Sequence, residues 1–139
     1  MVSALGLDLG ARRIGVAGCD RTGLIATGLT TIHKTDFDSL LRPLRQLIEE
    51  RDVEILVIGL PYTMDGQIGS QAKKIQKMAH RLSLSLSLPV EFVDERLTSF
   101  QAEQMLIAER RSLVRHKALI DRKAAAIILQ QWLDDRRAR

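Results

Sequence analysis

ALGLDLGARRIGVAGC, residues 4–19, decides the fold of this chain. Residues 4–9 and 13–19 are short apolar runs separated by a turn at residues 10–11, so they predict a hairpin of two antiparallel strands. Alternation along the first strand puts Asp8 on the same face as small residues. A lone carboxylate in a central strand is costly, so Asp8 predicts a ligand or metal site. The alternative is that Asp8 ends the strand and accepts hydrogen bonds from the turn.

The rest of the chain alternates between predicted strands and helices. Apolar spacing and turn residues predict strands at 25–32, 54–58 and 90–93, and helices at 37–51, 67–85, 98–110 and from 117 or 121 to 135. This order predicts an α/β fold with a mixed five-stranded sheet: three antiparallel N-terminal strands, two further parallel strands, and helices on both faces. Because the chain has 139 residues without repeats or linkers, we expect residues 1–139 to form a single domain.

Two places depart from a simple helical pattern. Pro43 lies just past the first turn of the first predicted helix, where we expect a modest distortion if Asp38 or Ser39 caps that helix. In the segment Leu82–Leu88 leucine and serine alternate, which is the pattern of a strand. We nevertheless favour a helix that continues to about Ser85.

Composition is typical of a soluble globular protein, with 45% hydrophobic and 27% charged residues. No apolar run is long enough to span a bilayer, and no signal peptide opens the sequence, so we expect a cytosolic protein. Cys19 is the only cysteine, which excludes an intramolecular disulfide and a cysteine-based zinc site. We interpret it as a small buried hydrophobe.

The net charge of +4 is concentrated toward the C-terminus. The segment from Arg110 to Lys123 is rich in basic residues and contains a single acid, Asp121. Three further arginines lie at the end of the sequence. Such clustering favours nucleic acid as a partner, because phosphate contacts release condensed counterions. The alternative is a solvated surface that is merely basic.

Acidic residues also follow a later strand. Asp94 and Glu95 come directly after the strand at 90–93, at the end where open α/β sheets bind ligands. Neighbouring strand residues point to opposite faces, so only one of the two is expected to share a cleft with Asp8. The alternative is a polar loop in which Arg96 is their ion-pair partner.

Asp121 lies on the buried stripe of the last predicted helix, because its spacing to Ala125, Ile128 and Trp132 is helical. A charge on that stripe needs a partner, and a metal ion is a suitable one. The alternative is that Asp121 is the N-cap of a helix that begins at Arg122.

These acids lie far apart in the sequence but could converge in the predicted fold. An all-oxygen set suits Mg²⁺ or Mn²⁺, and two such ions activate water and stabilise the leaving oxygen in phosphodiester cleavage. Without cations, the gathered carboxylates would repel one another. A rival interpretation of Asp8, Gly10 and Gly15 is a hairpin that wraps nucleotide phosphates, as in sugar kinases and actin-like ATPases, but the chain is too short for their two-domain body.

Four ordered motifs add a family resemblance: LGLDLGARRIGVA at 5–17, IGLPYTMDGQIG at 58–69, DERLTS at 94–99, and Asp121 followed by AAAIIL at 124–129. Over nearly the full length the chain resembles the YqgF family, the Holliday-junction-resolvase-like proteins also described as pre-16S ribosomal RNA nucleases. The resemblance implies a ribonuclease H-like fold and a metal-binding catalytic set of Asp8, an acid of the DER motif, and Asp121. Within that motif Glu95 is our first choice, supported by Asp94.

The resulting hypothesis is a metal-dependent endonuclease that holds two Mg²⁺ or Mn²⁺ ions and processes the 5′ end of pre-16S rRNA. The alternatives are a Holliday-junction resolvase acting on four-way DNA and a non-catalytic RNA-binding ribosome-assembly factor. The chain could work as a monomer or a homodimer. Basic residues that we expect to contact the nucleic acid are Arg12, Arg13, Lys73, Lys77, Arg81, Arg96, Arg115, Lys117 and Arg122.

Overall fold

The computed structural model describes residues 2–61, 68–94 and 117–138. Within them the strands and helices follow the order expected from the sequence. Their bounds are β1 Ala4–Leu9, β2 Arg13–Cys19, β3 Ala26–His33, α1 Asp38–Arg51, β4 Ile55–Leu60, α2 Ser70–Leu86, β5 Val90–Asp94 and α4 Lys117–Ala138.

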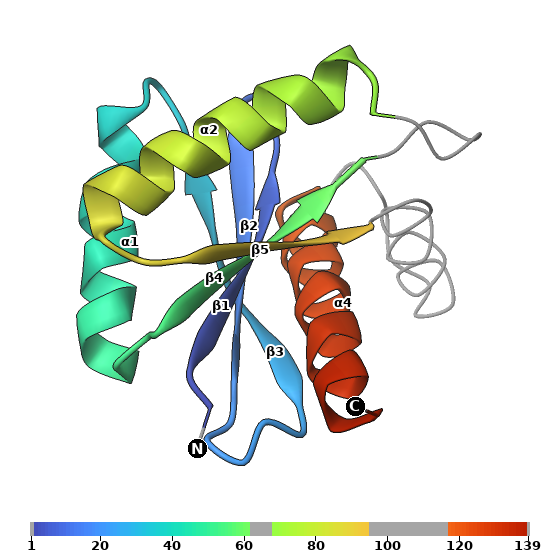
Figure 1. Cartoon of the computed structure of the whole chain (residues 1–139). Coiled ribbons are helices and arrows are strands. Elements are labelled where there is room, and N and C mark those ends of the chain that lie inside the picture. The colour runs from blue at the N-terminus through green and yellow to red at the C-terminus, as the bar shows by residue number, and fades with distance from the viewer. Residues whose placement is uncertain (1, 62–67, 95–116, 139) are drawn as a thin grey trace.

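The strands form one five-stranded sheet in the order β3-β2-β1-β4-β5. β1 pairs antiparallel with β2, and β2 antiparallel with β3, whereas β1 with β4 and β4 with β5 are parallel pairs. The predicted mixed sheet is therefore confirmed. Because β1, β4 and β5 run in the same direction, their carboxyl ends, including Asp8 and Asp94, lie toward the same end of the sheet (Figure 1).

Helices cover both faces of this sheet, as the alternating pattern predicted. α1 and α2 bury a stripe of residues on one face, against a cluster that includes Leu5 and Leu7 of β1. α4 packs alone among the described helices on the other face, where Ala125, Ile128 and Leu129 are fully buried. Figure 1 shows α4 running along this face, with the C-terminus at the end farther from α2. None of the described helices is long and apolar enough to cross a membrane.

The end of α2 agrees with the prediction from the sequence, whereas the start of α1 differs from it. α2 does continue through the leucine-serine alternation, ending at Leu86 before Ser87, which takes the left-handed conformation with φ 56°. Leu82 explains this, because it is fully buried against the sheet side of the helix. The predicted caps of α1 are wrong: the N–H of Ser39 donates to the carboxylate of Asp36 at 2.8 Å, ahead of the helix.

The remaining differences concern the C-terminal third. The predicted helix at 98–110 lies outside the described residues. α4 begins at Lys117, so Asp121 sits in its second turn, and the alternative of Asp121 as an N-cap is wrong. Pro43 lies inside α1, which continues to Arg51. One proline near the start removes a single backbone hydrogen bond, and the buried Leu40 and Leu44 hold the helix against the sheet.

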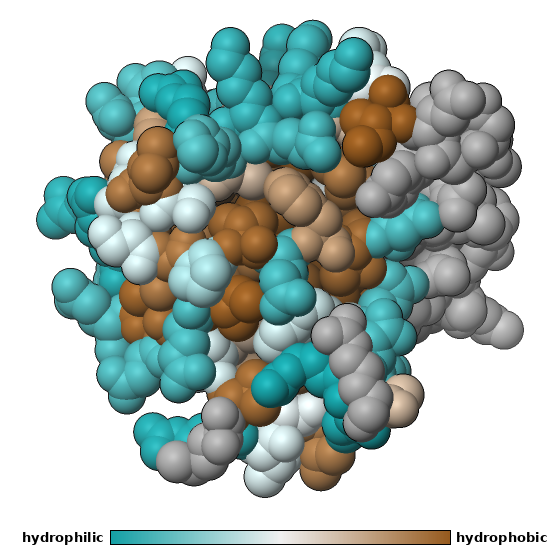
Figure 2. Space-filling model, viewed as in Figure 1, coloured by the Kyte–Doolittle hydropathy of each residue, from teal (hydrophilic) through white to brown (hydrophobic). Residues whose placement is uncertain are grey.

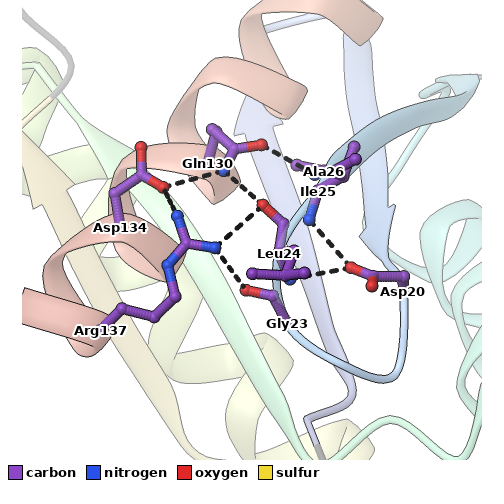
Figure 3. A network of polar contacts seen from close by, with 8 residues as sticks. All are labelled: Asp20, Gly23, Leu24, Ile25, Ala26, Gln130, Asp134 and Arg137. Atoms are coloured by element: carbon purple, nitrogen blue, oxygen red, sulfur yellow. Dashed lines mark hydrogen bonds and ion pairs between the residues drawn. The ribbon is translucent and has the colours of Figure 1, made fainter.

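The C-terminal half of α4 is held by the turn between β2 and β3 (Figure 3). The side-chain amide of Gln130 donates to the carbonyl of Leu24 at 2.9 Å, and its oxygen accepts from the N–H of Ala26 at 2.9 Å. Arg137 also donates to the Leu24 carbonyl, at 3.3 Å. The turn and the helix therefore hold each other in register.

Asp20 closes that turn from within. Its carboxylate accepts hydrogen bonds from the N–H groups of Leu24 and Ile25, both at 2.9 Å, and from the hydroxyl of Thr22. The bond from Ile25, followed by the one from Thr22, holds the pKa of Asp20 below its ordinary value. The charged carboxylate is thus the form that the folded turn prefers.

Acid should therefore loosen this turn. A carboxyl group whose pKa is lowered by folding adds stability above its ordinary pKa of about 3.9, and that contribution is lost as the pH falls through the lowered value. We expect the Tm of the Asp20→Ala variant to lie below that of the unmodified chain at pH 7, and the gap to shrink as the pH is lowered past about 4. Asp135→Ala, which alters an exposed acid on α4, is the control. A gap for Asp20→Ala that stays constant down to acid pH would contradict the assignment.

Candidate active site

Asp8 lies on the face of the sheet that α4 covers. Its neighbours Leu7 and Leu9 point to the opposite face and belong to the α1 and α2 core, whereas Ala4, on the same face as Asp8, belongs to the α4 core. Asp8 is partly buried in an otherwise buried strand. The predicted face is therefore confirmed, with small residues beside the carboxylate.

Gly15 brings α4 close to this carboxylate. Gly15 of β2 is the antiparallel partner of Asp8, so both residues face the same side of the sheet. A Cβ atom added at Gly15 would lie 2.0 Å from the carbonyl oxygen of Asp121, which no real contact allows. The backbone of Asp121 thus passes directly over the strand partner of Asp8. Two of the three predicted acids are brought together in this way.

Gly6 has the same effect one step further along the helix. A Cβ atom there would lie 2.8 Å from the carbonyl oxygen of Ala125 and 2.7 Å from the Cβ of Leu129. From the sequence, Gly15 was connected with a rival prediction of nucleotide phosphates and not with helix packing. In the structure its lack of a side chain is accounted for by the contact with α4, which leaves the nucleotide interpretation without that support.

Arg13 fixes the side chain of Asp121. Its Nε donates to Oδ2 of Asp121 at 2.7 Å, joining residues 108 positions apart in the sequence. The Arg13 side chain is 36% exposed and that of Asp121 only 18%, so the pair lies at the edge of the packed interface. Arg13 is predicted from the sequence to contact nucleic acid, and in the structure it also orients a candidate metal ligand.

Asp94 faces away from this pair of acids. Along β5, Glu91 accepts a hydrogen bond from the indole of Trp132 on α4 at 3.2 Å, and Val93 packs against the α4 core. Strand alternation therefore directs Asp94 to the other face, where its partner in β4 is Leu60. Glu95, our first choice within the motif, lies outside the described residues.

The predicted nucleic-acid contacts are spread over several elements. Arg12 is exposed in the β1–β2 turn, whereas Lys73 and Lys77 are exposed on α2, across the sheet from Asp8. Two of the predicted cations already have intramolecular contacts: the guanidinium of Arg81 lies 3.9 Å from the ring centre of Phe37, and Nε of Arg122 donates to the hydroxyl of Thr31 at 3.4 Å. Lys117 is the first residue of α4. Arg96 and Arg115 lie outside the described residues.

The donor set fits a hard divalent cation. Asp8 and Asp121 offer carboxylate oxygens, which Mg²⁺ and Mn²⁺ prefer. Among the described residues, no three His, Cys, Asp or Glu side chains lie close enough together to hold a metal ion. Of the predicted set, Asp8 and Asp121 lie within the described residues, and Glu95 lies outside them.

The chain is similar to known proteins over nearly its whole length. The family model RuvX, described as Holliday junction resolvase, matches residues 2–135. A protein of Trichormus variabilis named "Putative pre-16S rRNA nuclease" is 65% identical over 136 residues, covering 98% of this chain and 90% of that protein. A protein of Gloeothece citriformis with the same name is 59% identical over 137 residues, covering 99% and 91%.

Solved structures confirm the predicted ribonuclease H-like fold. Thermus thermophilus RuvC in complex with a Holliday junction substrate superposes with a TM-score of 0.61 at 13% identity, covering 99% of this chain and 97% of that one. The fowlpox virus resolvase in complex with Holliday junction DNA gives a TM-score of 0.58 at 12% identity, covering 96% and 98%. At such low identity these two structures speak for the fold alone.

Proposed function

Because this chain belongs to the RuvX family of Holliday-junction-resolvase-like nucleases, we propose that it hydrolyses phosphodiester bonds of structured RNA with divalent cations held by Asp8, Glu95 and Asp121. One observation carries the proposal. The first strand and the last helix, which lie at opposite ends of the sequence, bring Asp8 and Asp121 to one face at Gly15. Carboxylates gathered in this way repel one another, and a cation between them removes that cost.

Glu95 is proposed as the third ligand by elimination within its motif. Asp94 ends β5 and faces the side of the sheet away from α4. Glu95, the neighbouring acid of the DER motif, is then the candidate that would share the site with Asp8. Asp94 then has a supporting role, which matches its place in the DER motif.

The residues of the chain divide the work between them. Asp8 and Asp121 would hold the cations, which supply activation of water and stabilisation of the leaving oxygen when bound. Arg13 keeps the Asp121 carboxylate turned toward β2 through the 2.7 Å bond and offsets part of the negative charge. Gly15 and Gly6 let α4 lie close enough to the sheet for both acids to serve one site.

RNA is proposed as the physiological substrate, specifically the 5′ end of the pre-16S precursor. The relatives at about two-thirds identity over nearly the full chain are named for that activity. Four-way DNA is the second candidate, supported by the description of the family. Both substrates present the same phosphodiester to the acids, so substrate shape has to distinguish them.

Removal of metal tests the proposed chemistry directly. The purified chain is incubated with an end-labelled pre-16S fragment or a synthetic four-way junction, in Mg²⁺, in Mn²⁺ or with excess chelator. We expect cleavage only with a metal ion, because the paired acids need cations to bind the scissile phosphate. We also expect faster cleavage of the RNA, which is the proposed physiological substrate. Equal binding of the RNA with and without metal, with no cleavage under any condition, would instead establish a non-catalytic assembly factor.

A further inference from the structure

A groove lies between the β1–β2 turn and the first turns of α2, on the face of the sheet opposite α4. Its volume is about 400 Å³, and its lining includes Gly10, Ala11, Lys34, Gln71, Lys74 and Ile75. We call it the turn groove. The turn begins directly after Leu9, so the groove opens at the same end of the sheet as Asp8, where α2 passes across the strands (Figure 1).

Two lysines from different elements meet at the turn groove. Lys34 follows β3 and is held beside the turn by its backbone N–H, which donates to the carbonyl of Arg12 at 2.8 Å. Lys74 is exposed in the second turn of α2. Among the residues that the structure describes, neither ammonium group is paired with a carboxylate. The groove therefore offers two uncompensated positive charges.

The rest of the lining suits a sugar-phosphate chain. The turn is closed by the N–H of Gly10, which donates to the carbonyl of Arg13 at 3.0 Å, so this wall is fixed before any ligand arrives. Gln71 adds an amide that can donate to phosphate oxygens, and the partly exposed Met78 gives an apolar surface for a ribose ring. In Figure 2 hydrophilic side chains gather over α2 along the upper rim.

We propose that the turn groove binds the phosphodiester backbone of the substrate strand beside the cut, with Lys34 and Lys74 on successive phosphates. The inference rests on the proposed nuclease function, because the groove would receive the nucleic-acid strand as it leaves the Asp8 end of the sheet. Neither lysine was selected by the sequence, which pointed to the face of α2 that carries Lys73, Lys77 and Arg81. The groove then determines the path along which the substrate nucleic acid leaves the cleavage site.

The test removes both charges and compares this loss with the same loss elsewhere. The variant is Lys34→Gln/Lys74→Gln, and the matched control is Arg21→Gln/Arg42→Gln, which lowers the net charge equally at two exposed arginines that do not line the groove. Each carries Asp8→Asn as well, so that binding is measured without cleavage. Fluorescence anisotropy with a labelled pre-16S fragment and a four-way junction is recorded from about 50 to 200 mM salt, where phosphate contacts dominate.

We expect the slope of log affinity against log salt to fall by about 1.4–1.8 in the groove variant, from about 0.7–0.9 per lost phosphate contact. The control should keep the slope of the parent. In otherwise unmodified chains, the groove variant should raise KM while leaving kcat unchanged, because the lost contacts bind substrate and transition state equally. Equal slopes for variant and control would overturn the inference.

The two proposals can fail separately. If the groove variant loses slope but the unmodified chain never cuts, the groove stands as a nucleic-acid site and the nuclease proposal fails. If the unmodified chain cuts in metal and the groove variant binds as the control does, the nuclease proposal stands and the strand leaves the site by another route.

Discussion

The Asp8→Asn variant is expected to lose cleavage by more than about 100-fold while keeping its fold and its affinity for the nucleic acid. Loss of a group that only orients a metal ligand typically costs about 10–100-fold, so loss of the ligand itself should cost more. Asparagine is nearly the same size, so the partly buried position beside Gly15 is filled as before. Initial rates in Mg²⁺ and Mn²⁺, with the Tm and the anisotropy of labelled RNA, measure the three quantities.

Asp135→Asn is the matched control for that experiment. It makes the same chemical change at an exposed acid in the last turn of α4. Cleavage by this variant should equal that of the unmodified chain. Undiminished cleavage by Asp8→Asn, with a preparation shown to be free of contaminating nuclease, would remove the mechanism altogether.

Gly15→Ala is the second large effect, on stability and activity together. A Cβ atom 2.0 Å from the carbonyl oxygen of Asp121 requires α4 to move, because this oxygen belongs to the helix backbone and cannot rotate away. Overpacking of this kind costs about 1–3 kcal/mol, and we expect the upper end of that range. The Tm should fall by roughly 10 °C for a domain of this size, and cleavage should fall because Asp121 moves with the helix.

Gly18→Ala is the control on the same strand. Gly18 faces the other side of β2, where an added Cβ would meet the guanidinium of Arg51 at 2.8–2.9 Å, the flexible end of a long side chain. That side chain can shift at little cost, so the Tm should change far less than for Gly15→Ala. Cleavage is compared well below both Tm values, which separates displacement of Asp121 from loss of folded protein. Similar effects of the two variants would show that α4 does not depend on Gly15.

The features that could be predicted from the sequence are those that leave a periodic trace. The apolar runs around Asp8 and Asp121 gave the hairpin, the central strand and the buried stripe of the last helix, because the core selects residues at a period of two or close to four. Those periods placed Asp8 on the same strand face as small residues and Asp121 on the buried stripe of the last helix. The family motifs then connected the two acids.

Other features leave no such trace. Gly15 carries no functional group, so its close contact with Asp121 could be seen only once the helix was placed on the strand. Lys73 and Lys74 are adjacent basic residues with the same exposure, and only the position of the β1–β2 turn shows that Lys74 borders the groove. The hydrogen bond from the N–H of Ser39 to Asp36, ahead of α1, was missed because two other polar residues stood at equally plausible positions.

The pairing of the first strand with the last helix also governs when the activity can arise during synthesis. A nascent chain leaves the ribosome with Asp8 first, but Asp121, which completes the proposed carboxylate pair, is translated 108 positions after its partner Arg13. Until then the face of β1 that carries Gly6 lacks its covering helix. If the proposed site is right, polypeptides that end before Asp121 would lack one of its acids and would leave the RNA around them uncut.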